Sequence, residues 1–133
     1  MLRIAILGST GSIGCSALSV AMVHPDRVEV VGLAAGANVS RFAEQVEHHR
    51  PRVIAMAAED GLASVLSRLS EMTRGSVERS LAGPEGLVAV ATDPDVDLVL
   101  CATTGTTALD AVFAAIDAGK EAIADARIRS LID

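Results

Sequence analysis

The fold is decided by a short stretch near the start of the chain, Gly8-Ser9-Thr10-Gly11-Ser12-Ile13-Gly14. Residues 2–7, just before it, are apolar and partly β-branched, which predicts a buried strand. The apolar residues after it recur at helical spacing, at Ile13, Ala17, Leu18, Val20 and Ala21. A strand, a glycine turn and a helix within about twenty residues are typical of the start of a dinucleotide-binding unit.

Each glycine of this stretch has its own expected role. Gly8 allows the chain to reverse sharply at the end of the strand. Gly11 allows the backbone to approach a pyrophosphate, and Gly14 allows the helix to lie close to the sheet. Two residues separate Gly8 from Gly11, where the commonest fingerprint has one, so a plain tight turn is the alternative interpretation.

The candidate phosphate-binding residues are Thr10, Gly11, Ser12 and Ile13. We expect their backbone amides to point at the phosphates, where the positive end of the helix dipole adds attraction. The hydroxyl groups of Thr10 and Ser12 can donate further hydrogen bonds to phosphate oxygens. The stretch therefore predicts a binding site for a small-molecule dinucleotide.

Composition favours a single domain over residues 1–133 that binds a metabolite. Half of the residues are hydrophobic and only Phe42 and Phe113 are aromatic, so Ala, Val, Leu and Ile must form the core. A net charge of −6 argues against nucleic-acid binding, which needs clustered Lys and Arg. The absence of Trp and Tyr also removes most platforms for base stacking.

Several features predict a soluble cytoplasmic protein. Cys15 and Cys101 are too few for a disulfide framework. The first strand begins so early that it leaves no room for a signal peptide. The longest apolar stretch is interrupted by Asp110 and Asp117, so we expect no membrane span.

Strands and helices alternate along the rest of the chain. Further strands are predicted at residues 28–34, 53–57 and 97–102 and near residues 122–124. One helix is expected to begin at Asn38 or Ser40 and to end before Pro51, and another is expected to begin at Asp60. The alternation predicts an α/β fold, a doubly wound, Rossmann-like parallel sheet in a three-layer α/β/α arrangement.

The last third of the chain is less uniform. Residues 75–86 carry the weakest pattern, with a short strand expected near Val77 and a helical turn after it. Residues 108–118 form a clear helical pattern that ends at Gly119. We expect this helix to bury Leu109, Val112, Phe113 and Ile116.

The end of the second strand indicates which nicotinamide dinucleotide fits. An NAD site places an acidic residue about twenty residues past the glycines, but Ala34 lies there and the loop at residues 35–38 has no acid. The absence of an acid permits the 2′-phosphate of NADPH. Asn38 can donate to that phosphate, and Arg41 is the nearby cation, unless Arg41 lies on a solvated helix face.

Four segments together resemble one enzyme family. They are the GSTGSIG stretch at residues 8–14, Ala35-Gly36-Ala37-Asn38, Pro51-Arg52 and Ala118-Gly119-Lys120, and they resemble the amino-terminal domain of 1-deoxy-D-xylulose 5-phosphate reductoisomerase. The resemblance runs from about residue 2 to residue 120. It implies that Thr10, Gly11, Ser12 and Ile13 hold the pyrophosphate and that Gly36, Ala37 and Asn38 surround the 2′-phosphate. Position 37 is often basic in the family, so Ala37 implies weaker charge neutralisation, for which Arg41 is a candidate substitute.

The resemblance also implies an activity, an NADPH-dependent rearrangement and reduction in isoprenoid biosynthesis that uses Mg or Mn. The family continues with Ala-Asn-Lys-Glu-Ser-Leu, where this chain has Ala126-Arg127-Ile128-Arg129-Ser130-Leu131. The metal-binding acids of the family lie further on, so we expect no metal ligands here. We expect the chain to bind NADPH without turnover on its own, and its exposed apolar surface to favour a homo-oligomer.

Two other functions stay open on the sequence alone. One is an NADP-dependent oxidoreductase of the semialdehyde-dehydrogenase type, which would require Cys101 as a nucleophile. No histidine is placed to activate this thiol, so we interpret Cys101 as a buried core residue. The other is a non-catalytic dinucleotide-binding module.

The remaining polar and titratable residues receive structural interpretations. We interpret Cys15 as a small core residue that faces the sheet. His48 and His49 point about 100° apart on a helix and cannot readily chelate one metal ion. The acids Asp93, Asp95 and Asp97 are expected to form a turn and open a strand, and Arg127 and Arg129 to be solvated charges.

Overall fold

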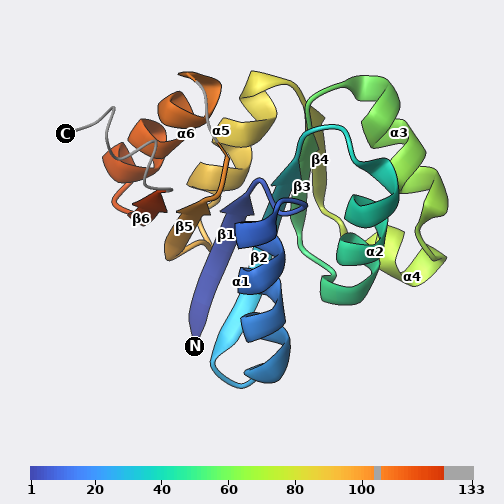
Figure 1. Ribbon diagram of the computed structural model, residues 1–133, viewed down its shortest axis with the longest axis horizontal. Coiled ribbons are helices and arrows are strands. Elements are labelled where there is room, and N and C mark those ends of the chain that lie inside the picture. The colour runs from blue at the N-terminus through green and yellow to red at the C-terminus, as the bar shows by residue number, and fades with distance from the viewer. Residues whose placement is uncertain (104–105, 125–133) are drawn as a thin grey trace.

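The computed structural model describes residues 1–103 and 106–124. Strands and helices alternate through this part of the chain, except that two helices, α3 and α4, lie between β3 and β4 (Figure 1). The strands are β1 (Leu2–Leu7), β2 (Val28–Ala35), β3 (Val53–Met56), β4 (Arg79–Ala82), β5 (Leu98–Cys101) and β6 (Glu121–Ala124). The helices are α1 (Ser12–Val23), α2 (Val39–His49), α3 (Glu59–Arg68), α4 (Glu71–Ser76), α5 (Pro84–Thr92) and α6 (Thr106–Asp117).

The strands form one parallel sheet in the order β4-β3-β2-β1-β5-β6. Strand β1 pairs with β2 on one side, where Leu7 is opposite Ala34, and with β5 on the other, where Leu7 is opposite Cys101. The winding direction therefore changes at β1. In open α/β sheets, ligands bind at such a point, beyond the carboxyl ends of the strands. The predicted doubly wound Rossmann-like sheet is confirmed.

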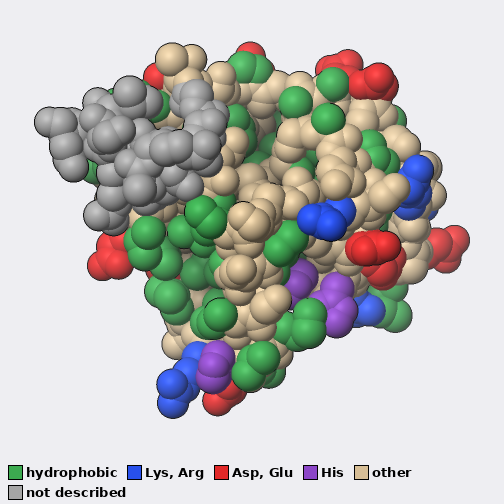
Figure 2. Space-filling model, viewed as in Figure 1, with side chains coloured by type: hydrophobic (Ala, Val, Ile, Leu, Met, Phe, Trp, Pro, Cys, Tyr) green, Lys and Arg blue, Asp and Glu red, His purple; other side chains and the backbone are tan. Residues whose placement is uncertain are grey.

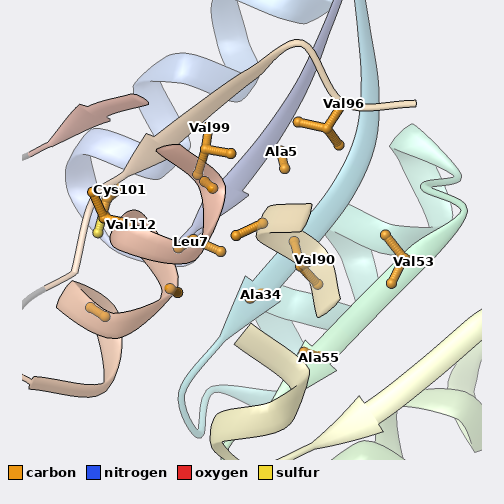
Figure 3. Packing of buried hydrophobic residues seen from close by; sticks show 14 of the residues in the cluster. Ala5, Leu7, Ala34, Val53, Ala55, Val90, Val96, Val99, Cys101 and Val112 are labelled. Atoms are coloured by element: carbon orange, nitrogen blue, oxygen red, sulfur yellow. The ribbon is translucent and has the colours of Figure 1, made fainter. Parts of the chain in front are cut away.

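Two separate hydrophobic clusters cover the two faces of the sheet. Successive side chains of β1 point to opposite faces, so Ile6 joins one cluster and Leu7 the other. The Ile6 cluster includes Leu18 of α1 and Phe42 of α2. The Leu7 cluster includes Val90 of α5 and Val112 of α6 (Figure 3). Helices on both faces of the sheet make the predicted three layers.

A helix that the sequence did not predict, α4, lies mostly before the weakly patterned residues 75–86 and overlaps only their start. Helix α4 begins after Ser70, whose hydroxyl accepts a hydrogen bond from the amide of Thr73. The carboxylate of Glu47 accepts hydrogen bonds from the amide and hydroxyl of Ser70 and from the hydroxyl of Thr73. These donors, the Ser70 amide foremost, hold the pKa of Glu47 below its usual value. Val77 ends α4, so the strand expected near Val77 begins two residues later.

Several apolar residues predicted to be buried lie at the surface. Phe113 and Ile116 of α6 are 46% and 50% exposed, because the small residues Ala108, Ala111 and Ala115, with Val112, face the sheet instead. Ile13 and Val20 of α1, which the sequence placed on a helix without a prediction of burial, are also exposed. Hydrophobic side chains are visible at the surface over α1 (Figure 2).

Two predicted helix starts have different outcomes. Asn38 caps α2, because its side chain accepts a hydrogen bond from the amide of Arg41 at 3.2 Å. Asp60 does not cap α3, which has Ala58 at its N-cap, and the Asp60 carboxylate accepts instead from the amide of Gly61. Gly119 has a φ of +83° at the end of α6, as its predicted role as the helix end requires.

The amino ends of the strands carry a network of ion pairs. Arg52 contacts both Glu29 at 3.2 Å and Asp95 at 2.8 Å, and Arg3 contacts Asp95 and Asp97. The Arg3 amide and guanidinium hold the pKa of the Asp97 carboxyl below its usual value. The predicted role of these acids in a turn and at the start of a strand is confirmed, since the Asp95 amide also bonds Asp93.

Within the described ranges, no helix has the length and apolar character needed to cross a membrane.

Candidate dinucleotide-binding site

The glycine turn is held tightly at the carboxyl end of β1. Gly8 has a φ of +86°, and the amides of Gly8 and Ser9 both donate to the carbonyl of Ala34 in β2. A Cβ on Gly14 would lie 2.4 Å from the carbonyl oxygen of Gly8 and 2.6 Å from the Cα of Ser9. The packing of the chain therefore requires glycine at both ends of the turn.

Helix α1 begins with backbone donors that point out of the turn without a side-chain cap. Its N-cap residue is Gly11, and none of the described side chains caps the helix. The Gly11 amide donates to Gly8, and the first amide that bonds within the helix is that of Cys15, to Gly11. The amides of Ser12, Ile13 and Gly14 come before the first intrahelical bond. Such a helix start attracts anions.

The second predicted segment, Gly36, Ala37 and Asn38, follows β2 and lies beside the glycine turn because β1 and β2 are paired. All three residues are exposed, and a Cβ on Gly36 would have no neighbour within 4 Å. The side-chain oxygen of Asn38 caps α2, which leaves its Nδ2 group as a donor. The fold thus brings the two predicted segments together at one edge of the sheet.

Helix α2 contacts the glycine turn through two side chains. The guanidinium of Arg41 donates to the carbonyl of Thr10 at 3.2 Å. One helical turn later, the Gln45 amide group exchanges two hydrogen bonds with Ser9, both of 2.8 Å. Arg41 is exposed, as its alternative interpretation on a solvated helix face requires, but its guanidinium also contacts the turn. Sequence reasoning missed Ser9 and Gln45, although Arg41 and Gln45 have the i, i+4 spacing that places two side chains on one helix face.

A cleft of about 260 Å³ lies along the same edge of the sheet. Its walls come from the carboxyl ends of β1 to β4, from the residues after β5, and from α5 and α6. They include Gly8, Gly36, Met56, Gly83, Leu87 and Thr103. Gly83 has a φ of +83° and precedes Pro84, the first residue of α5. Sequence reasoning did not place Gly83 or Leu87 at the site. The Gly83-Pro84 pair was the available signal, because glycine and then proline often mark the start of a helix.

The two cysteines lie in different surroundings. Cys101 is fully buried at the end of β5, and its thiol lies 3.5 Å from the carbonyl of Thr103, so its interpretation as a core residue is confirmed. Cys15 does not face the sheet as predicted, because Gly14, Leu18 and Ala21 occupy that side of α1. The Cys15 thiol is half-buried and lies 3.6 Å from the side-chain nitrogen of Gln45.

The part of the chain that the structure describes offers no metal site. The rings of His48 and His49 lie edge to face with centroids 5.0 Å apart. No group of three His, Cys, Asp or Glu residues in the described ranges could hold a metal ion. Arg127 and Arg129, with the rest of residues 126–131, lie outside these ranges.

Comparison with known proteins identifies the family. The sequence profile of 1-deoxy-D-xylulose 5-phosphate reductoisomerase matches residues 4–131. The chain belongs to this reductoisomerase family. Curated reductoisomerases from Anaeromyxobacter sp. strain K and Methylococcus capsulatus are 48% and 46% identical to it, over 120 and 123 residues. These matches cover 90% and 92% of this chain but only 30% and 31% of those proteins, so the chain spans about a third of their length.

Solved reductoisomerase structures share the fold. The enzyme from Zymomonas mobilis in complex with NADPH superposes with a TM-score of 0.84 at 29% identity, over 98% of this chain and 33% of that one. A reductoisomerase in complex with NADPH, fosmidomycin and magnesium superposes with a TM-score of 0.79 at 32% identity, over 92% of this chain and 29% of that one. The family and fold predicted from the sequence are both confirmed.

Proposed function

We propose that residues 1–133 form the NADPH-binding domain of a reductoisomerase. The observation that carries the proposal is the position of the glycine turn. The first backbone amides of α1, which make no intrahelical bond, lie beside the loop of Gly36, Ala37 and Asn38. In this proposal Thr10, Gly11, Ser12 and Ile13 bind the diphosphate of NADPH, and the loop binds the 2′-phosphate. The reductoisomerases that superpose on the chain include complexes with NADPH.

The glycine at position 11 supports the diphosphate assignment. A Cβ on Gly11 would meet only the Gly8 carbonyl oxygen, at the ordinary contact distance of 3.6 Å. The backbone of Gly11, with a φ of −78°, is also open to any residue. Neither packing nor backbone conformation requires glycine here, whereas close approach of a phosphate to the helix start does.

The apolar cleft supports the placement of the adenine. The cleft is contiguous with the 2′-phosphate loop, because Gly36 is one of its lining residues. Ala57, Pro84 and Leu87 are apolar residues that line the same space and are not fully buried, which suits the faces of an aromatic ring. We place the adenosine in this cleft, between the ends of β2 and β3.

Arg41 supports the choice of NADPH over NADH. No acid stands in the loop after β2 to repel a 2′-phosphate, and Asn38 retains a donor. Arg41 lies three residues beyond Asn38, and its guanidinium is held at Thr10, next to the loop. A guanidinium in this position can neutralise a phosphate that Ala37 cannot.

The proposed activity of the whole protein is that of its relatives, the NADPH-dependent conversion of 1-deoxy-D-xylulose 5-phosphate to 2-C-methyl-D-erythritol 4-phosphate. In this scheme the described residues bind and orient the hydride donor. Magnesium accompanies relatives in solved structures, but the donor set described here does not fit a metal. We propose a cytoplasmic location, in which NADPH is available, and no interaction with nucleic acid.

The two alternative functions receive no support. A thioester-forming nucleophile would have to be Cys101, which is fully buried. The family match favours a reductoisomerase domain over a non-catalytic module.

Titration of the purified 133-residue chain with NADPH and with NADH, followed by nicotinamide fluorescence, tests the proposal. We expect saturable binding of NADPH with at least about tenfold preference over NADH, the loss that one charged contact entails. Equal affinity for both would contradict the assignment of the loop. We also expect the chain alone not to oxidise NADPH when 1-deoxy-D-xylulose 5-phosphate and magnesium are added.

A further inference from the structure

The side chain of Gln45 is the main polar link between α2 and the glycine turn. Its Oε1 accepts from the Ser9 hydroxyl and its Nε2 donates to the Ser9 carbonyl, each at 2.8 Å. Ser9 has no exposed surface, so water cannot replace these partners. Breaking the pair leaves the buried hydroxyl of Ser9 unsatisfied and its carbonyl with only the Cys15 thiol, a weak donor at 3.7 Å.

Ser9 is also the residue that connects the sheet to the phosphate-binding amides. Its own amide donates to Ala34 of β2, and the next residue, Thr10, is the first of the proposed diphosphate ligands. Besides two longer contacts from the Cys15 thiol to the carbonyls of Ser9 and Thr10, four hydrogen bonds between nitrogen and oxygen atoms fix the direction in which the chain leaves Ser9. They are the bonds of the Ser9 amide, hydroxyl and carbonyl, and the bond from Arg41 to Thr10. Two of the four come from Gln45.

We propose that Gln45 is a positioning residue for the diphosphate site, which it never touches. The inference rests on the proposed binding of NADPH. Helix α2 begins at Asn38, in the 2′-phosphate loop, and reaches Ser9 at Gln45, so one rigid helix connects the two phosphate sites. Gln45 sets the distance and orientation between them, and a dinucleotide that spans both sites depends on it more than a ligand that occupies only the 2′-phosphate site.

Three ligands distinguish a positioning role at the diphosphate site from a general loss of structure. ADP carries a diphosphate and no 2′-phosphate, 2′-AMP carries a 2′-phosphate and no diphosphate, and NADPH carries both. The test variant is Gln45→Met, because methionine has nearly the same length and helix propensity but cannot make either hydrogen bond. Binding of each ligand to the 133-residue chain is measured by NMR titration or calorimetry.

We expect Gln45→Met to bind ADP and NADPH about tenfold more weakly, since the turn loses two hydrogen bonds, and to bind 2′-AMP within twofold of the original chain. The matched control is Glu44→Gln, at the exposed neighbouring position on α2, which should leave all three affinities unchanged. A folded Gln45→Met chain with unchanged ADP affinity would overturn the inference. Equal weakening of all three ligands would also overturn it, because a merely structural role has that signature.

A second variant keeps the test decisive if Gln45→Met does not fold. Ser9→Ala removes the hydroxyl bond and keeps the bond from Gln45 to the Ser9 carbonyl. We expect about threefold weaker ADP binding and unchanged 2′-AMP binding, and no change in ADP binding would refute the positioning role. Failure of the original chain to bind any of the three ligands would instead contradict the proposed function itself, and the inference with it.

Discussion

The two ends of the parallel sheet use charge in opposite ways. At the amino ends of the strands, Arg3 and Arg52 are paired with Glu29, Asp95 and Asp97. At the carboxyl ends, the glycine turn presents backbone amides of α1 that lie ahead of the first intrahelical bond. Arg41, the cation held beside that turn, bonds a carbonyl rather than a carboxylate.

The difference separates stability from function. Charged side chains that already have partners of opposite sign stabilise the fold and attract a charged ligand only weakly. Donors without such partners are held ready for an anion that comes from outside. We therefore expect changes at the amino ends to affect unfolding and changes at the carboxyl ends to affect NADPH binding.

The largest effect should come from Gly14→Ala, because the added methyl group would clash with the glycine turn at the carboxyl end of β1. The new Cβ would lie 2.4 Å from the Gly8 carbonyl oxygen, so the helix must move away from the turn. We expect a loss of about 1–3 kcal/mol of stability and no detectable NADPH binding. Gly75→Ala in α4 is the control, because its Cβ would meet nothing within 4 Å. Thermal unfolding and fluorescence titration measure the two quantities, and wild-type NADPH affinity in Gly14→Ala would be inconsistent with the turn as described.

Arg41→Met should separate the two cofactors without unfolding the chain. Arg41 is exposed, so we expect little change in the melting temperature. NADPH binding should weaken about tenfold and NADH binding should stay the same, because only NADPH carries the 2′-phosphate. Competitive titration measures the ratio. An equal loss of affinity for both cofactors would contradict a contact between Arg41 and the 2′-phosphate and would indicate a contact with the diphosphate instead.

Arg52→Met tests the other end of the sheet. The change removes both ion pairs of Arg52, whose side chain is 35% exposed. We expect a loss of about 1 kcal/mol in unfolding free energy, since partly exposed pairs contribute little, and unchanged NADPH affinity. Arg79→Met is the control, because Arg79 is exposed and makes no ion pair within the described ranges. A fall in NADPH affinity for Arg52→Met would contradict the expectation that residues at the amino ends of the strands affect stability alone.

The smallest effect concerns pH. Hydrogen bonds from Arg3 lower the pKa of the Asp97 carboxyl in the folded chain. The ionised Asp97 carboxylate therefore stabilises the fold fully above the ordinary pKa of about 4. This stabilisation is lost as the pH falls through the lower pKa that Asp97 has in the folded chain. Denaturant unfolding should show a weaker decline below pH 4 for Asp97→Asn than for the original chain. Asp26→Asn, in an exposed turn, should leave the decline as it is.

The glycine turn could be predicted from sequence because its rules are local. A glycine with positive φ ends the strand and one without room for a Cβ opens the helix, and both requirements appear within Gly8 to Gly14. The cap at Asn38 follows from the same kind of rule. The doubly wound parallel sheet also followed, because alternating strands and helices leave few right-handed topologies.

Features that depend on distant contacts could not be predicted. Gln45 meets Ser9 across 36 residues of sequence. The i, i+4 spacing of Arg41 and Gln45 places the two side chains on one helix face but does not indicate the partner of Gln45. Helix α4 depends on Glu47, which lies more than twenty residues before it. The exposure of Phe113 follows from the small residues that α6 turns towards the sheet, which a helical pattern of large apolar residues does not reveal.

Backbone amide mapping by NMR shows whether the amides of Thr10 to Ile13 bind the diphosphate. In a titration of the isotopically labelled chain with ADP, we expect the largest amide shifts at residues 10–14, and we expect NADPH to add shifts at residues 36–41. The paired amino ends of the strands should stay unchanged with either ligand. Saturable binding with the largest shifts away from residues 10–14 would contradict the account.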